Sequence, residues 1–355
     1  MRSILIYILL LSSFALHAQD RKTIVYDGSD LKTFFNELKD NSIVIFKNEE
    51  IIYEETLIVE GKTNIEFQFN GFTIKSVTNG ENATPSDPVY KNRWPRNRAH
   101  FVIKNSDSII VRDLRIVGPN INGGVKEEAY VKELEAQHAL ELRNTSYIQI
   151  TDCAFSQIYG DGIYITGTSE NIDITKSIIE KNGRQGIAIT NGSNISIREN
   201  QISMIRRSHI DLEPNNDGEI VSNVLIENNE FGRQRLNWVA AASSKGVVRN
   251  VTVKNNMVNS AGNIWIGNKS NKHMQGPYIF DTNTSTKIYG TNNGGIWRLI
   301  RVDGFKAVAN NIMAQANRRM FLIYATDSEN IELGENEVPN GRNQYKTYFG
   351  KGANK

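Results

Sequence analysis

The feature that most constrains this chain is a short unit that recurs every 23 or 24 residues. Leu140, Ile163, Ile187 and Ile210 each open a segment of alternating apolar and polar residues, at steps of 23, 24 and 23 residues. A period of this length with several short strands per unit predicts a solenoid, in which each unit stacks on the previous one. A second and a third alternation follow in the units, at Ile148-Gln149-Ile150, Ile172-Asp173-Ile174, Ile195-Ser196-Ile197, Val224-Leu225-Ile226 and Val251-Thr252-Val253, and near Ile178-Ile179, Ile202 and Phe231.

The turns between these alternations are rich in asparagine. Asparagine tolerates left-handed backbone conformations and forms local hydrogen bonds, so it suits a turn that is repeated in register. Equivalent strands of stacked coils lie ~4.8 Å apart, which lets each asparagine bond to the next. We therefore expect asparagine ladders along the stack. One set is Asn171, Asn194, Asn223, Asn250 and Asn330, and a second is Asn228-Asn229, Asn255-Asn256 and Asn310-Asn311.

Three short strands per coil predict an all-β fold, a single-stranded right-handed parallel β-helix with an N-terminal capping helix. The sequence has no long amphipathic helices, which a Rossmann fold or an α/β barrel would need between its strands. Ser29-Asp30 followed by Leu31, Phe34, Phe35 and Leu38 predicts an N-capped amphipathic helix that covers the first coil. We expect one β-helix domain over residues 19–355, with the cap at 19–60, coils at about 61–338 and a C-terminal tail at 339–355.

The first 18 residues have the pattern of a secretory signal peptide. Arg2 precedes an apolar run from Ile4 to Leu16, and the small residue Ala18 marks the expected cleavage point. The run is too short to cross the ~30 Å hydrocarbon core of a bilayer. We expect the mature protein to be secreted or periplasmic, with no membrane partner.

The net charge and the cysteine content restrict the possible partners of the protein and the forces that stabilise its fold. The formal net charge is +2, so no strong field draws the chain to nucleic acid. Cys153 is the single cysteine and cannot form an internal disulfide. Its place in an apolar alternation indicates a buried structural thiol. Packing must therefore stabilise the fold, and we expect a monomer.

These repeats resemble those of the pectate-lyase-like superfamily of right-handed parallel β-helix proteins, over roughly Asn64 to Asn336. That superfamily includes polysaccharide lyases, mannuronan epimerases, polygalacturonase-type hydrolases and non-catalytic surface proteins. The resemblance implies a shallow groove along one sheet, bordered by loops inserted between strands. It also implies that the acid and base would be His, Tyr, Lys or Arg.

The strands that open the units carry the candidate site. Side chains alternate along a strand, so the neighbours of the inward-facing residues are expected on the outer face. Solvated strand faces of solenoids often carry Thr, Asn and Lys, so a cluster of His, Tyr, Arg, Asp and Glu favours a functional site. The outward residues are Glu141, Arg143, Tyr164, His209, Asp211 and Glu213. The strand entrances carry, in register, His138, Asp161, Arg184-Gln185 and Arg207-Ser208. The small residues Gly162, Gly186 and Ala188 are expected to leave a trough.

These residue types suit β-elimination on a uronate, in which a base removes the C5 proton and the group on C4 leaves. Tyr164 and His209 are the candidate acid and base. Arg184, Arg207 or Arg143 would neutralise the substrate carboxylate. A sugar as the leaving group would make the enzyme a polysaccharide lyase, and a hydroxyl at a chain end would make it an oligosaccharide dehydratase.

The acidic residues of the cluster have two interpretations. Asp211, Glu213 and Glu141 could hold Ca²⁺, which takes oxygen ligands, or could orient His209 and the arginines. His138 and Tyr130 are second candidates for proton transfer or substrate binding.

Three insertions break the coil length, at residues 78–99, 118–137 and 268–295. Long loops on a rigid scaffold often collect binding groups. Trp94, Arg96 and Arg98 in the first loop offer a ring face and guanidinium groups to an acidic sugar. Tyr130 lies in the second loop, and Asp161 completes the predicted substrate-binding set.

The sequence leaves two other classes of function open. Asp211 and Glu213 point the same way, ~7 Å apart along a strand, which suits an inverting glycoside hydrolase. Against this interpretation, the adjacent-aspartate and His-Gly signatures of polygalacturonase-type enzymes are absent. A non-catalytic carbohydrate-binding β-helix would instead show uniform coils and bland strand faces. The Asp-Pro-His-Asp motif associated with mannuronan epimerases is missing. We expect a uronate-containing poly- or oligosaccharide, including sulfated algal or plant polymers, as the substrate.

Overall fold

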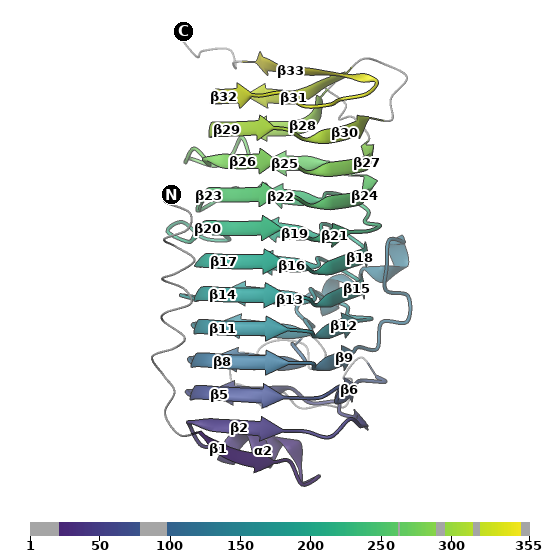
Figure 1. The fold of residues 1–355 in the computed structure, drawn as a ribbon, viewed down its shortest axis with the longest axis vertical. Helices are drawn as coiled ribbons and strands as arrows, with labels where there is room; N and C mark the ends of the chain where they lie inside the picture. The colour runs from purple at the N-terminus through teal and green to yellow at the C-terminus, as the bar shows by residue number, and fades with distance from the viewer. Residues whose placement is uncertain (1–20, 79–97, 262, 289–294, 315–319, 349–355) are drawn as a thin grey trace.

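The computed structural model describes residues 21–78, 98–261, 263–288, 295–314 and 320–348. These residues form a stack of coils in which three strands alternate with turns (Figure 1). Every strand pairs in parallel with the equivalent strand of the next coil, which gives three long sheets of 11, 12 and 10 strands. Within these residues no helix is long and apolar enough to span a membrane.

The first sheet contains the strand that opens each coil and carries most of the predicted site. The register aligns Leu140, Ile163, Ile187 and Ile210, as the sequence predicted. In chain order its strands are β4 (Leu57–Glu60), β7 (Phe101–Lys104), β10 (Leu140–Arg143), β13 (Ile163–Thr166), β16 (Ile187–Ile189), β19 (Ile210–Leu212), β22 (Val239–Ala241), β25 (Ile264–Ile266), β28 (Gly295–Ile300), β31 (Met320–Thr326) and β33 (Gly341–Tyr348).

The second and third sheets complete the coil. The second sheet comprises β1 (Lys22–Val25), β2 (Ser42–Ile45), β5 (Thr63–Gln68), β8 (Asp107–Arg112), β11 (Ser146–Thr151), β14 (Glu170–Thr175), β17 (Gly192–Arg198), β20 (Ile220–Glu227), β23 (Val247–Lys254), β26 (Tyr278–Asp281), β29 (Asp303–Val308) and β32 (Glu329–Leu333). The third sheet comprises β3 (Glu50–Ile52), β6 (Thr73–Lys75), β9 (Arg115–Val117), β12 (Ala154–Ser156), β15 (Ile178–Asn182), β18 (Gln201–Ile205), β21 (Glu230–Phe231), β24 (Met257–Ala261), β27 (Thr284–Ile288) and β30 (Asn311–Ala314).

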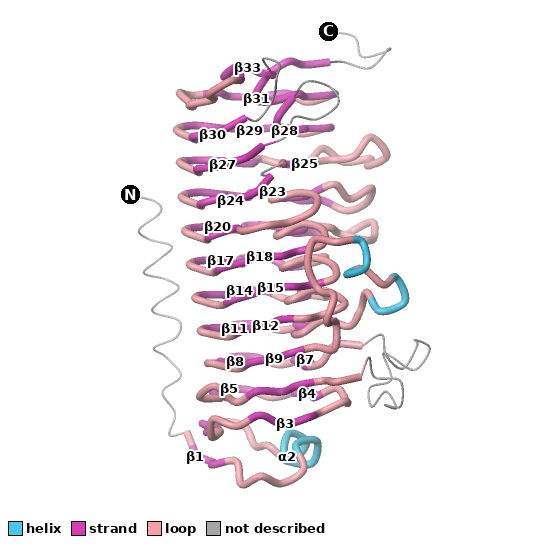
Figure 2. Tube along the Cα trace, turned by 90° about the vertical axis from the view of Figure 1, so that its right-hand side faces the viewer, coloured by secondary structure: helices cyan, strands magenta, loops and turns pink. Residues whose placement is uncertain are grey.

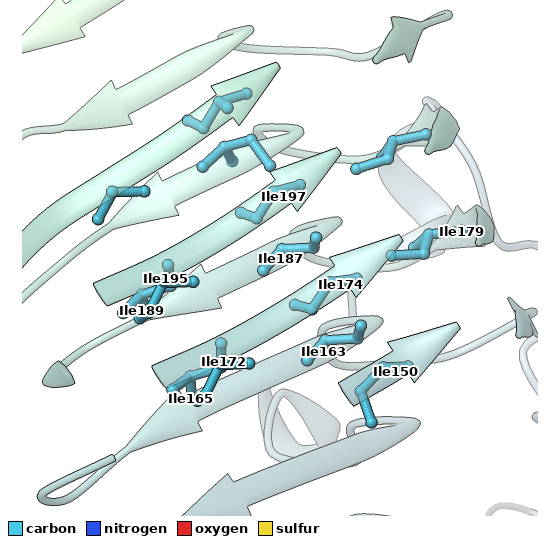
Figure 3. Packing of buried hydrophobic residues seen from close by; sticks show 14 of the residues in the cluster. Ile150, Ile163, Ile165, Ile172, Ile174, Ile179, Ile187, Ile189, Ile195 and Ile197 are labelled. Atoms are coloured by element: carbon cyan, nitrogen blue, oxygen red, sulfur yellow. The ribbon is translucent and has the colours of Figure 1, made fainter. Parts of the chain in front are cut away.

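The core consists of apolar ladders inside the coil. Ile163 and Ile187 of the first sheet and Ile172 and Ile195 of the second are almost completely buried, and isoleucines of successive coils stack above one another (Figure 3). Cys153 lies in the same core, and burial raises the pKa of its thiol to about 12. The predicted structural thiol is confirmed.

Both asparagine ladders are present, except that the predicted member Asn330 donates its side-chain amide to Asp303 instead of to an asparagine. Asn194, Asn223 and Asn250 adopt left-handed conformations with φ near 56°, and each donates its side-chain amide to the asparagine of the preceding coil. The second ladder is buried and runs through Asn200, Asn229, Asn256, Asn283, Asn310 and Asn336, each side chain donating to the next at 2.9–3.0 Å. It satisfies backbone groups inside the turn that no strand can reach.

Removing one member of the buried ladder should destabilise the protein strongly. Asn256 donates to the Ile226 carbonyl and to Asn283, and accepts from the amides of Asn229. Asn256→Ala leaves these buried groups unpaired, and we expect the free energy of unfolding to fall by about 3 kcal/mol. Chemical denaturation measures it, with Asn259→Ala on the exposed surface of the same coil as the control. Equal stability of the two variants would contradict the structural role of the ladder.

A short helix covers the N-terminal end of the stack, as predicted. Helix α2 (Leu31–Glu37) is N-capped by Asp30, whose carboxylate accepts the Thr33 backbone amide at 2.9 Å. Phe35 packs against Phe46, Phe67 and Phe101, with ring centroids 5.5–6.2 Å apart. The helix therefore closes the open end of the apolar interior.

The coils extend beyond the predicted limits at both ends. Strands β1 to β4 already belong to the three sheets, within the segment expected to form only the cap. At the other end β33 pairs with β31, in the segment expected to be a tail.

Candidate active site on the first sheet

The predicted strand entrances meet in a ladder of side chain to backbone hydrogen bonds. His138, Asp161, Gln185 and Ser208 occupy equivalent positions on four successive coils. His138 Nδ1 lies 3.1 Å from the Asp161 amide, Asp161 Oδ1 accepts the Gln185 amide at 2.9 Å, and Gln185 Oε1 accepts the Ser208 amide at 2.7 Å. Each coil therefore positions the functional side chain of the coil before it.

Arg184 lies at the centre of the cluster. Its Nη1 donates to Asp161 Oδ2 at 2.8 Å, while Glu135 and Glu213 approach its Nε and Nη2 at 3.6 and 3.8 Å. These carboxylates, Asp161 most of all, raise the pKa of the guanidinium. Arg184 is thus a permanent cation whose charge is already balanced by protein carboxylates.

Asp161 and Asp211 are buried carboxyl groups with opposite behaviour. Burial raises the pKa of Asp161, but Arg184, His138 and the Gln185 amide outweigh it and leave the pKa below its ordinary value. For Asp211, burial and the nearby Glu213 raise the pKa well above its ordinary value, and Arg184 offsets only part of this. The site therefore pairs a carboxyl group whose surroundings favour the ionised form with one whose surroundings favour the protonated form.

Asp211 belongs to the outer face of the first sheet. It lies between Ala188 and Ala240 in the register, and Gln185 Nε2 donates to its Oδ2 at 2.5 Å. The two alanines place little bulk on either side of it. Glu213 follows at the end of the same strand, and its side chain is 39% exposed.

Tyr164 and His138 form an aromatic pair two coils from Asp211. Their rings are parallel within 6° and their centroids are 4.4 Å apart. The Thr190 hydroxyl lies 3.4 Å from the Tyr164 hydroxyl. Burial raises the pKa of Tyr164, so its hydroxyl stays protonated at neutral pH.

The insertion at residues 118–137 folds against one side of this cluster. Its two short helices, η2 (Glu127–Ala129) and η3 (Lys132–Leu134), stand out from the stack (Figure 2). Tyr130 donates to Glu135 at 3.0 Å, and the Arg207 guanidinium lies 4.8 Å from the centroid of the Tyr130 ring. The insertion therefore brings Glu135 and Tyr130 to Arg184 and Arg207.

Comparison with known proteins identifies the architecture. Residues 102–276 match the family model described as a right handed beta helix region. The chain is a right-handed parallel β-helix protein. This confirms the predicted fold class and, at the level of fold, the resemblance to the pectate-lyase-like superfamily. No curated protein was found whose sequence matches the chain.

Solved β-helix structures with different activities share this fold. An alginate lyase from Paenibacillus sp. str. FPU-7 is 12% identical with a TM-score of 0.51, over 92% of this chain and 99% of that one. An endo-xylogalacturonan hydrolase from Aspergillus tubingensis is 10% identical with a TM-score of 0.58, over 92% and 95%. The Streptococcus pneumoniae surface protein and adhesin PfbA is 16% identical with a TM-score of 0.51, over 93% and 86%. At such identities the likeness concerns the fold alone.

The expectation that His209 faces outward is wrong. The β-helix buries this residue completely, with its ring centroid 5.1 Å from that of Phe231. His209 precedes β19, where the turn has not yet adopted the strand alternation, so its Cβ points toward the third sheet. Gly162 and Gly186 occupy the same position, and a Cβ there would collide with Ile179 or Ile202 of that sheet. These glycines therefore do not form the predicted trough, whereas Ala188 does face outward.

Two other predicted groups lie apart from the cluster. Arg98 is buried, and its guanidinium donates to the Glu54 backbone carbonyl, so it is not part of an exposed binding loop. Trp94 and Arg96 lie outside the described residues. The remaining predicted pair, Glu141 and Arg143, is joined by an ion pair on β10, one rung before Tyr164.

Two residues of the cluster, Gln185 and Glu135, had no predicted role. The repeat places Gln185 at a strand entrance in register with Asp161, and in the structure it links Asp161 to Asp211 through its hydrogen bonds. Glu135 reaches Arg184 only through the fold of an irregular insertion, for which no repeat gives a register.

The residues present do not fit a calcium site well. Ca²⁺ takes six to eight oxygen ligands. Asp211 favours its protonated form, and Arg184 already occupies the cationic position beside Glu213. Within the described segments no group of three or more His, Cys, Asp or Glu side chains is arranged around a common point for a metal. Calcium binding at Asp211 and Glu213 stays a prediction.

Proposed function

We propose that the protein is a carbohydrate-active enzyme that hydrolyses a glycosidic bond with inversion, on the outer face of the first sheet. The observation that carries this proposal is the pair of carboxyl groups on one strand, the buried Asp211 and the part-exposed Glu213, where burial also raises the pKa of Asp211. Inverting hydrolases need one protonated and one ionised carboxyl group on opposite sides of the bond. The β-helix fold shared with a polysaccharide lyase and a polysaccharide hydrolase supports a sugar polymer as the substrate class.

Asp211 is the proton donor in this mechanism. Its buried carboxyl gives a proton to the glycosidic oxygen as the bond to the anomeric carbon breaks, and the Gln185 amide stabilises the carboxylate that remains. Glu213 is the general base that activates the attacking water. Residues two apart on a strand lie ~7 Å apart, within the separation that leaves room for this water.

Arg184 and Asp161 are positioning residues. Arg184 bridges Asp161 and Glu213 across two coils, so it holds the general base in place. Asp161, ionised and buried, fixes Arg184 in turn. The three carboxylates of Glu135, Asp161 and Glu213 around the Arg184 guanidinium make the reaction centre acidic. This favours a neutral sugar at the cleaved bond over a uronate, because a substrate carboxylate would be repelled there.

Product analysis tests the reaction type. The mature protein is incubated with uronate-containing and neutral poly- and oligosaccharides, and reducing ends, ultraviolet absorbance and the anomeric configuration of new ends are followed. New reducing ends with inverted configuration and no absorbance would support the proposal. Absorbance of an unsaturated uronate would establish elimination, as a lyase if the chain is cut and as a dehydratase if only water is lost. The absence of both new reducing ends and ultraviolet absorbance would favour a non-catalytic binding protein.

The stacked pair of Tyr164 and His138 favours β-elimination as a second candidate function. Tyr164 lies on the same outer face of the first sheet, two rungs from Asp211, and its hydroxyl stays protonated, as an acid for a leaving group must. Tyr164→Phe keeps the stacked ring and removes only the hydroxyl. If the reaction is hydrolysis by Asp211, we expect the rate to stay within about threefold of wild type, because no proton passes through Tyr164. A loss of about 100-fold or more would instead assign Tyr164 to the chemistry.

A further inference from the structure

The outer face of the first sheet continues well beyond the candidate active site. The position occupied by Asp211 is followed on successive coils by Ala240, Trp265, Arg298 and Tyr324. Arg298 therefore lies three rungs from Asp211, or ~14 Å along the groove. A polymer bound at Asp211 and running along the stack would pass over these side chains.

Trp265 offers a binding surface that the core does not need. Its neighbours Ile264 and Ile266 are buried, whereas Trp265 points outward and is 39% exposed. The guanidinium of Arg298 lies 4.7 Å from the centroid of the indole ring. This stacking holds Arg298 in one orientation without neutralising its charge.

Arg298 lacks the carboxylate partners that surround Arg184. Across the described part of the chain no Asp or Glu oxygen lies within ion-pair distance of Arg298, and its buried Nε has no hydrogen-bond partner. A buried guanidinium nitrogen without a partner is costly, and an anionic oxygen would satisfy it. The charge on the outer face of the first sheet therefore changes sign along the stack, from negative around Glu213 to positive at Arg298.

We propose that Trp265, Arg298 and Tyr324 form a second carbohydrate-binding site, for a sugar unit that carries a carboxylate or a sulfate. The sugar ring stacks on the exposed aromatic surface, and Arg298 donates to the anionic group. The inference rests on the proposal that this face binds a sugar polymer, but not on the reaction type. It predicts a mixed substrate, with a neutral unit at the cleaved bond and an anionic unit about three rungs away.

Binding to an inactive protein tests this site. In an Asp211→Asn background, affinities are measured by calorimetry for neutral, carboxylated and sulfated forms of one polymer backbone. Arg298→Gln should weaken binding of the anionic forms about tenfold or more and leave the neutral form unchanged. Trp265→Ala should weaken all forms. The form most affected by Arg298→Gln identifies carboxylate or sulfate as the ligand.

Arg249→Gln and Ile279→Ala are the matched controls. Both residues are exposed on the second sheet, away from this groove, and both variants should bind as the background protein does. The proposal would be overturned if Arg298→Gln lowered the affinity for neutral and anionic polymers equally, or left the affinity for anionic polymers unchanged. It would also be overturned if none of the anionic polymers bound to the background protein. If the anionic polymers bind through Arg298 but the protein with Asp211 intact hydrolyses none of them, the proposed reaction is refuted and this binding site stands.

Discussion

Asp211→Asn should abolish turnover while making the protein more stable at neutral pH. Asparagine has the same shape and its oxygen can still accept from Gln185 Nε2, but it cannot deliver a proton to the leaving oxygen. Loss of a general acid costs about 10³-fold in rate. We expect a folded enzyme whose activity on the substrate of the wild-type protein falls by that factor.

The stability change follows from the same carboxyl group. Because the folded-state pKa of Asp211 lies above its value in the unfolded chain, the folded state binds more protons between the two pKa values. Stability therefore falls as pH rises through that window, and the wild-type protein carries the part of the penalty that has accumulated by neutral pH. Asparagine carries no such penalty, so the melting temperature of the variant should rise.

Asp217→Asn, which changes an exposed acid in the loop after the same strand, is the control and should alter neither rate nor melting temperature. A variant at position 211 that turns over at more than about one tenth of the wild-type rate would remove Asp211 from the mechanism. An inactive but destabilised variant would show that burial of the carboxylate is compensated, and would refute the cause given for its raised pKa.

The protein should lose stability steeply in mild acid because of two buried histidines. Burial lowers the pKa of His209 to about 3, since neither ring nitrogen has a well-formed hydrogen bond and a weak interaction with the Gly232 backbone does not offset it. His100 behaves alike, with burial and then Arg98 lowering its pKa to about 3. Both residues are neutral when folded and gain a proton when unfolded below about pH 6.5.

The sign of the effect is set by proton uptake. Between about pH 6.5 and 3 the unfolded chain binds more protons, so stability falls as the pH falls through this window. Each histidine should remove about 2 kcal/mol between roughly pH 7.5 and 5. Denaturant unfolding at a series of pH values measures this, and His209→Phe should reduce the acid loss by about half of the combined value.

His273→Gln removes an exposed histidine and should lose as much stability on acidification as the wild-type protein does. If His209→Phe kept the full pH dependence, His209 would not be a buried neutral group, and its placement in the core would be wrong.

The repeat allowed the first half of the site to be predicted, because one period fixes both strand direction and register. The spacing of Leu140, Ile163, Ile187 and Ile210 is enough to bring His138, Asp161 and Arg184 to adjacent coils. The prediction failed at His209, one residue before its strand, because strand alternation does not extend into the turn. Backbone geometry determines where the turn ends and the strand begins, and the residue types at that position do not indicate it.

The far half of the groove was missed for a different reason. Ile264 and Trp297 are paired in the register but lie 33 residues apart, since an insertion lengthens that coil. Without the common period, Trp265 and Arg298 cannot be aligned from the sequence. Their contact depends on which residues the longer coil leaves outside the stack, and only the folded chain shows this.

The outer face gains one strand from each coil, and this spacing sets a scale for recognition. Side chains at equivalent positions of different coils are separated by whole multiples of the coil spacing, ~4.8 Å, so the distances between binding groups take only discrete values. Altered specificity would then arise by exchanging the residue at one coil position, without moving the others. Adding or removing a coil between Asp211 and Arg298 would instead shift the recognised charge along the polymer by one coil spacing.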